Sequence, residues 1–204
     1  PAIGWQREPA RGYAVVSLCT WDRPGLFSRI TGVLAECGLN ILGARIFTRE
    51  DSIALDHFFV TDARTGQLPK GPQREQCQER LAAALSAEQD IELDLERLPT
   101  DTLEYQAIAG ERIPTVIEFD NRSSAEFTVL DLEAEDHVGL LYVVSDTLAQ
   151  LGLNIQLAKI NTEEGAAIDS FYIIDRDITK IVNQARQRKI AARLREAIED
   201  LYAA

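Results

Sequence analysis

Hydrophobic and polar positions follow the same succession of periods twice along the chain. Each repeat opens with a strand-like alternation, passes into apolar residues at helical spacing, and continues with two alternating runs separated by a turn signal. Gly38 and Gly152 stand where a glycine commonly ends a helix. The expected strand, helix, strand and strand span residues 13–19, 24–37, 40–48 and 53–61, and again 127–132, 138–151, 154–162 and 166–174.

A second amphipathic helix is expected after each hairpin, over residues 72–87 and 178–202. Residues 91–95 then alternate as a closing strand of the first repeat, which gives the order βαββαβ. We predict an α+β chain of two ferredoxin-like units, each an antiparallel sheet with its helices on one face. The expected division is an N-terminal extension, a first domain, a linker and a second domain, over residues 1–12, 13–98, 99–124 and 125–204.

The linker carries a strand-like run over residues 113–119 that has no partner of its own. The second repeat reaches residue 204 within its helix and so lacks a closing strand, and an open sheet edge is an aggregation hazard. We therefore predict that residues 115–119 pair within the sheet of the second repeat. The alternative is that they extend the sheet of the first.

Matching sequence blocks support the repeat. Residues 21–27 align with 135–141, and 38–48 with 152–162, without a gap. A deletion of one residue then aligns Asp56 with Asp169 and Leu81 with Leu194. Chance does not produce ordered blocks of this kind, so the chain contains two versions of one unit.

The net charge of −12 narrows the classes of partner. A surface that binds phosphate groups needs the opposite sign, so we expect no nucleic acid and no membrane as partners. The main basic stretch is interpreted as a solvated face of the last helix; it comprises Lys180, Arg186, Arg188, Lys189, Arg193 and Arg195.

The remaining composition favours a cytoplasmic protein. Cys19, Cys37 and Cys77 are an odd number and widely spaced in the sequence, which favours reduced thiols over a disulfide framework. No apolar run approaches the ~20 residues of a membrane span, and no signal peptide is visible. The chain starts at Pro1 and contains no Met, so we expect it to be part of a longer polypeptide.

A loop before the first helix of each repeat is a candidate for ligand binding. In the first loop, Asp22 can cap the helix, Pro24 suits its first turn, and Gly25 allows another backbone to approach. The helix start then offers unpaired N–H groups and a positive dipole end to a carboxylate or phosphate. The loop recurs over residues 136–139. The alternative is a capped helix with nothing bound.

Asn40 and Asn154 open the second strand of each repeat. Each side chain carries a donor and an acceptor, as recognition of an amino acid's α-groups or of a side-chain amide requires. The alternative is an asparagine that closes a turn.

Catalytic and metal-binding patterns are missing from the sequence. His57 and His137 each follow an aspartate but lie at non-equivalent positions of the repeat, which argues against a metal site. There is no Ser-His-Asp order, Gly-rich phosphate loop or CxxC. We therefore predict no catalytic residue, no metal and no cofactor, and a chain that is not an enzyme by itself.

The order strand, Asp-x-Pro-Gly-Leu helix, Gly-Leu-Asn-Ile strand, hairpin and helix resembles the ACT domain, a regulatory module that binds amino acids. The tandem arrangement and the blocks at 21–30, 40–48 and 152–160 resemble the C-terminal ACT pair of the bacterial protein-PII uridylyltransferase/uridylyl-removing enzyme family. That resemblance implies glutamine sensing that controls uridylylation and deuridylylation of PII in nitrogen regulation. The alternatives are a free-standing ACT-repeat regulator and an interaction module without a ligand.

The resemblance also implies the site residues and partners. The expected ligand-binding residues are Asp22, Arg23, Pro24, Gly25, Leu26, Asn40 and Ile41, with Asp136, His137, Val138, Gly139, Leu140, Asn154 and Ile155. Val138 departs from the family pattern, in which proline is usual, and so loosens the turn of the second loop. The implied partners are a free amino acid, the catalytic domains of a parent enzyme, and a second chain in a homodimer formed through sheets or helices.

Overall fold

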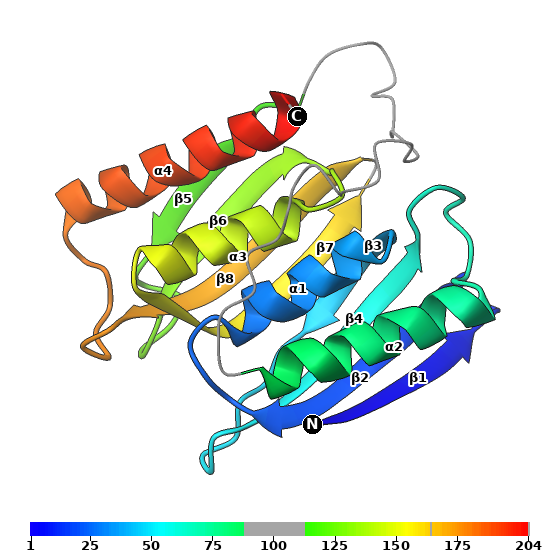
Figure 1. The fold of residues 1–204 in the computed structure, drawn as a ribbon. Coiled ribbons are helices and arrows are strands. Elements are labelled where there is room, and N and C mark those ends of the chain that lie inside the picture. Colours follow the sequence, from blue (N-terminus) through cyan, green and yellow to red (C-terminus); the bar gives the residue numbers. More distant parts are fainter. Residues whose placement is uncertain (88–112, 164, 204) are drawn as a thin grey trace.

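The alternating runs of both repeats assemble into a single antiparallel sheet. A computed structural model of the chain describes residues 1–87, 113–163 and 165–203. Within these residues, eight strands follow the order β1-β2-β4-β3-β7-β8-β6-β5, and four helices cover one face of the sheet (Figure 1). The predicted α+β class and the helices on one face are confirmed.

Both repeats contain the same succession of elements. The first has β1 (Ala2–Glu8), β2 (Tyr13–Trp21), α1 (Leu26–Glu36), β3 (Leu39–Arg45), β4 (Ile53–Asp62) and α2 (Gly71–Ser86). The second has β5 (Val116–Asp120), β6 (Thr128–Glu135), α3 (Leu140–Gln150), β7 (Leu153–Glu163), β8 (Ala166–Asp175) and α4 (Gln184–Ala203). The expected closing strand over residues 91–95 lies outside the described residues.

The linker strand lies in the sheet of the second repeat. β5 pairs antiparallel with β6, with Phe119 opposite Leu130, as predicted for residues 115–119. β1 pairs with β2 in the same way, with Trp5 opposite Val16. Val16 and Leu130 are equivalent in the alignment, so the N-terminal extension is the counterpart of the linker strand. Each repeat therefore starts one strand earlier than the sequence blocks indicate.

The two repeats meet about a local twofold axis. β3 pairs antiparallel with β7, with Arg45 opposite Lys159, and these two residues are equivalent in the repeat. In the helical layer, the hydroxyl oxygens of Thr31 on α1 and Ser145 on α3 lie 3.4 Å apart, and these residues are also equivalent. Equivalent residues of the two repeats therefore contact each other both in the sheet and in the helical layer, as a half-turn that exchanges the repeats requires.

A tight turn starts the first helix of each repeat, which makes the predicted Asp22 cap wrong. α1 has Gly25 at its N-cap and no side-chain capping bond. The Leu26 N–H donates to the Arg23 carbonyl at 3.1 Å, and Gly25 has φ 76°, as position i+2 of a type II turn requires. Gly139, at φ 93°, forms the equivalent turn before α3, although Val138 replaces the proline.

The last helix begins six residues later than the expected start at residue 178. Ile178 adopts a left-handed backbone with φ 57°, and the Lys180 ammonium donates to the backbone carbonyls of Asn121 and Ser124, so Lys180 is not part of a solvated helix face. The Asn183 side chain then accepts the N–H groups of Ala185 and Arg186. This asparagine acts as the N-terminal cap that the periodicity of apolar residues does not reveal.

Two arginines bind the C-terminal carbonyls of α2. The buried Arg29 guanidinium donates to the carbonyls of Ala84 and Ala87, both at 2.9 Å, and Arg23 donates to Leu85 at 3.0 Å.

No helix among the described residues is long and apolar enough to cross a membrane. Cys37, at the C-cap of α1, and Cys77, on α2, are free thiols.

Replacing Arg29 with alanine is expected to lower the free energy of unfolding by about 3 kcal/mol, because hydrogen bonds to a charged donor are lost and buried carbonyls remain unpaired. Urea unfolding of the purified chain measures this loss. The exposed Arg193, paired with Glu196 on α4, is the matched control, and Arg193→Ala is expected to cost under about 0.5 kcal/mol. Equal losses for the two variants would contradict this role of Arg29.

Candidate ligand-binding site

A cavity of about 160 Å³ lies at the seam between the two repeats. The first repeat contributes the loop before α1, the first turn of that helix, and residues of β4 and the β3–β4 connection. The second repeat contributes α3 and the start of β7. This cavity, called the first cavity below, therefore exists only because the two repeats pack side by side.

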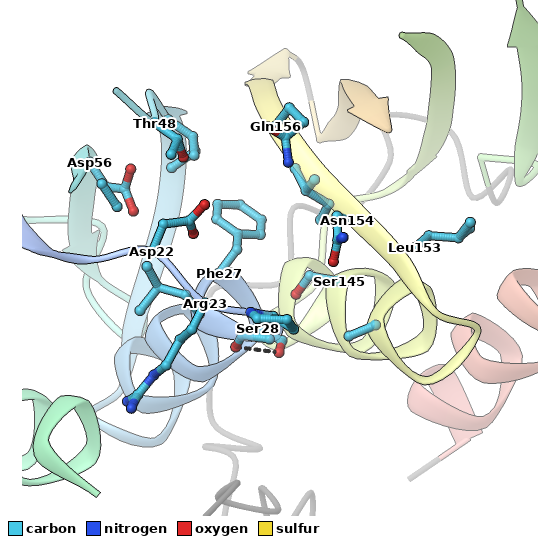
Figure 2. Close-up of a pocket in the computed structure, with 17 residues that line it drawn as sticks. Asp22, Arg23, Phe27, Ser28, Thr48, Asp56, Ser145, Leu153, Asn154 and Gln156 are labelled. Carbon is cyan, nitrogen blue, oxygen red and sulfur yellow. Dashed lines mark hydrogen bonds between the residues drawn. The ribbon is translucent and has the colours of Figure 1, made fainter. Parts of the chain in front are cut away.

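One wall of the first cavity is acidic. Figure 2 shows Asp22, Thr48 and Asp56 on the side of the cavity formed by the first repeat. Asp56 is 2% exposed and accepts the Phe47 N–H at 3.4 Å. Burial raises its pKa to about 7, and the neighbouring negative charge of Asp22 acts in the same direction. Burial also raises the pKa of Asp22, against the hydrogen bond from Thr48. A cationic group bound here would offset the unfavourable energy of these buried, neighbouring negative charges.

The opposite wall is polar and uncharged. The side chains of Asn154 and Gln156 extend from β7 on the other side of the cavity (Figure 2). Between the walls lies the start of α1, whose first-turn N–H groups have no acceptor within the helix. Phe27 forms an apolar wall, with its ring stacked on buried Phe58 at 5.8 Å. The cavity thus combines an anion-binding helix start with an acidic wall and side-chain amides.

The local twofold axis generates a second cavity of about 20 Å³, enough for a single water molecule. Its walls come from the loop before α3 and from the start of β3. The Asn40 amide donates to the Asp136 carboxylate at 3.3 Å. Asp169 is 3% exposed and accepts the Asn161 N–H at 3.2 Å. Burial raises its pKa to about 7, with the negative charge of Asp136 acting in the same direction.

The structure brings most of the expected residues together, but across the repeats. The loop over residues 22–26 shares the first cavity with Asn154 and Ile155. The loop over 136–140 shares the second with Asn40 and Ile41, except that Val138 does not line it. The sequence alone indicates that the asparagines neighbour the loops, but it does not assign either asparagine to one loop. Each cavity is therefore built from residues of both repeats.

Two of the expected residues turn their polar groups elsewhere. The Arg23 side chain points away from the first cavity toward the carbonyls of α2, including Ala87 at 3.1 Å (Figure 2). The His137 ring lies against Tyr202, with Nδ1 2.9 Å from the Val138 carbonyl oxygen. Both residues contribute to cavity walls, and these contacts hold the loops in place.

Sequence reasoning missed the buried aspartates. β4 buries alternate residues, so that Asp56 lies on the same face as Ala54, Phe58 and Val60. Asp169 lies on the core face of β8 in the same way. A carboxylate at an apolar position of an alternating strand, repeated in both halves, was the available signal. Among the described residues, no group of three or more His, Cys, Asp and Glu could hold a metal ion.

Family models match both halves of the chain. Residues 13–71 match a model described as an ACT domain, and residues 116–201 match one described as an ACR9-like, ACT-like domain. These two matches fall on the two repeats.

Curated relatives match nearly the whole chain. A bifunctional uridylyltransferase/uridylyl-removing enzyme from Novosphingobium aromaticivorans is 35% identical over 94% of this chain and 21% of its own length. Another with the same name, from Rhodospirillum rubrum, is 32% identical over 94% of this chain and 20% of its own length. The chain thus spans about a fifth of these relatives. A crystal structure of aspartate kinase from Synechocystis matches 94% of this chain and 27% of its own, with 17% identity and a TM-score of 0.46.

Proposed function

Because this chain carries two ACT-type domains in tandem, we propose that it is the amino-acid-sensing regulatory part of a bifunctional uridylyltransferase/uridylyl-removing enzyme. Its own role is to bind the effector, and the chemistry belongs to other domains of the parent enzyme. The observation that carries this proposal is the first cavity, which the two repeats build jointly from an acidic wall, a helix start and two side-chain amides.

An α-amino acid matches the chemistry of this cavity at both ends. Its carboxylate suits the N–H groups and positive dipole end at the start of α1. Its ammonium group suits the carboxylates of Asp22 and Asp56, which burial disfavours in their charged form. Glutamine adds a side-chain amide that donates and accepts, as the amides of Asn154 and Gln156 also do. We therefore propose glutamine as the ligand.

A ligand at the seam can act on the relative position of the repeats. Such a ligand contacts the first repeat through the α1 loop and the second through β7, so it stabilises the arrangement in which both contacts form. Other domains that contact both repeats would sense this change. In our proposal, the bound state sets the balance between adding and removing uridylyl groups on PII.

Glutamine is expected to raise the melting temperature of the purified chain. At 100 times its dissociation constant, a ligand that binds only the folded state adds about 2.7 kcal/mol of stability. Replacing Gly25 with valine is expected to reduce this shift, because φ 76° is strained for a β-branched residue and the loop lines the first cavity.

Gly139→Val is the matched control, since Gly139 has φ 93° in the equivalent turn but does not line the first cavity. Both variants should be less stable without ligand, while only Gly25→Val loses the glutamine-dependent shift. If no protein amino acid at millimolar concentration changes the melting curve of the unaltered chain, the sensing proposal is wrong and the interaction-module alternative is favoured.

A further inference from the structure

The two cavities are related by the local twofold axis but differ about eightfold in volume, at about 160 and 20 Å³. Building on the proposed function, we infer that each chain binds one amino acid, in the first cavity alone, and that Tyr142 closes the second. The module is therefore a single-site sensor built from two nearly equivalent halves.

We attribute the difference in volume to the pair of equivalent wall residues that differs most in size. Ser28 is the third residue of α1, and Tyr142 is the third residue of α3. The Ser28 hydroxyl turns back onto its own helix start and donates to the Gly25 carbonyl at 3.0 Å, which leaves the first cavity open (Figure 2). Tyr142 is 7% exposed and lines the second cavity, where its phenol ring occupies space that serine leaves free.

A hydrogen bond across the seam reinforces the closure. In the first cavity, Asp22 lies on the same wall as Thr48 of its own repeat (Figure 2). In the second, Asp136 instead accepts the amide N–H of Asn40 from the other repeat, at 3.3 Å. The hydroxyl of Thr162, equivalent to Thr48, is buried with no hydrogen-bond partner among the described residues. Asp136 thus joins the two walls of the second cavity, where a ligand would have to separate them.

The two cavities share part of their wall chemistry, although the Gln156 amide of the first has Leu42 at the equivalent position. The inward aspartates, Asp56 and Asp169, are equivalent, as are the asparagines on β7 and β3. The acidic wall and the asparagine amide, which suit the α-groups of an amino acid, are therefore present twice, and in our inference the small volume of the second cavity keeps a ligand out. Exchanging the residues at positions 28 and 142 should then move or duplicate the site.

Isothermal titration calorimetry of the 204-residue chain with glutamine, and then with the other protein amino acids, tests this inference. We expect one binding event per chain for the unaltered protein. Ser28→Tyr should weaken that event at least about 100-fold, and Tyr142→Ser should add a second event. Tyr142→Phe, which keeps the ring, should retain one event, and Ser28→Thr should retain binding. Melting curves without ligand verify that every variant is folded.

The outcomes separate the inference from the proposed function. Two binding events in the unaltered chain, unchanged binding in folded Ser28→Tyr, or a single event in folded Tyr142→Ser would each overturn the single-site inference and leave amino-acid sensing intact. An absence of binding by the unaltered chain and all variants would overturn the proposed function and the inference together.

Discussion

Replacing both buried aspartates with asparagine, Asp56→Asn with Asp169→Asn, is expected to raise the free energy of unfolding at pH 8 by about 3–7 kcal/mol. Burial raises the pKa of each carboxyl from 3.8 to about 7, and each pKa unit corresponds to about 1.4 kcal/mol. The amide carries no charge, but burying its unpaired N–H groups offsets part of the gain by about 1–3 kcal/mol at each position.

The same pair should make stability depend on pH. Between pH 4 and about 7 the folded chain binds more protons at Asp56 and Asp169 than the unfolded chain, so stability falls as pH rises through this range. Urea unfolding at pH 5, 6.5 and 8 should show this fall in the unaltered chain and a smaller one in the double variant. The raised pKa values of Asp22 and Asp136 add a contribution of the same sign that both proteins retain.

The control for the aspartate pair is Asp51→Asn in the exposed hairpin between β3 and β4, expected to change stability by under about 0.5 kcal/mol. If the double variant shows the same pH dependence as the unaltered chain, the two buried carboxylates do not carry it.

Truncating either of two equivalent phenylalanines, Phe58→Ala or Phe171→Ala, is expected to lower the free energy of unfolding by about 3–5 kcal/mol. Both side chains are fully buried, one on β4 and one on β8, and each truncation leaves a cavity in the core. Urea unfolding measures the two losses, which we expect to be similar.

The two truncations should differ in their effect on the proposed ligand. Phe58 stacks on Phe27, which walls the first cavity, whereas Phe171 lines neither cavity. The glutamine-dependent rise in melting temperature should therefore shrink in Phe58→Ala and persist in Phe171→Ala. If the glutamine-dependent rise in melting temperature is equal in the two variants, the wall formed by Phe27 does not depend on its contact with Phe58.

The sequence predicted the elements that carry strong periodicity. The strand at Val116–Asp120 was expected because its β-branched residues lacked a partner, and β6 provides one. β1 was missed because it carries inward apolar side chains only at Ile3 and Trp5, between polar residues and a glycine. The equivalence of Ile3 with Ile117, and of Trp5 with Phe119, becomes clear only from the registers in which β1 pairs with β2 and β5 pairs with β6.

The site was predicted in its parts but not in its assembly. The loops at Asp22 and Asp136 were expected to bind ligand, yet which asparagine joins which loop depends on the pairing of β3 with β7. That pairing joins residues more than a hundred positions apart, and no local pattern specifies its register. The Asp22 cap failed for a local reason, since the turn at Gly25 separates this aspartate from the helix.

The outer strands of the sheet, β1 and β5, each precede the rest of their repeat in the chain, and this order has a consequence during synthesis on the ribosome. β1 is made before the rest of the first repeat, so this repeat has all its described strands once α2 has emerged. The inner strand β3 must then wait for β7, which at about 5–20 residues per second takes several seconds. During that interval β3 is an open edge on the nascent chain, and the exposed charge of Arg45 on this strand hinders its pairing with a neighbouring chain.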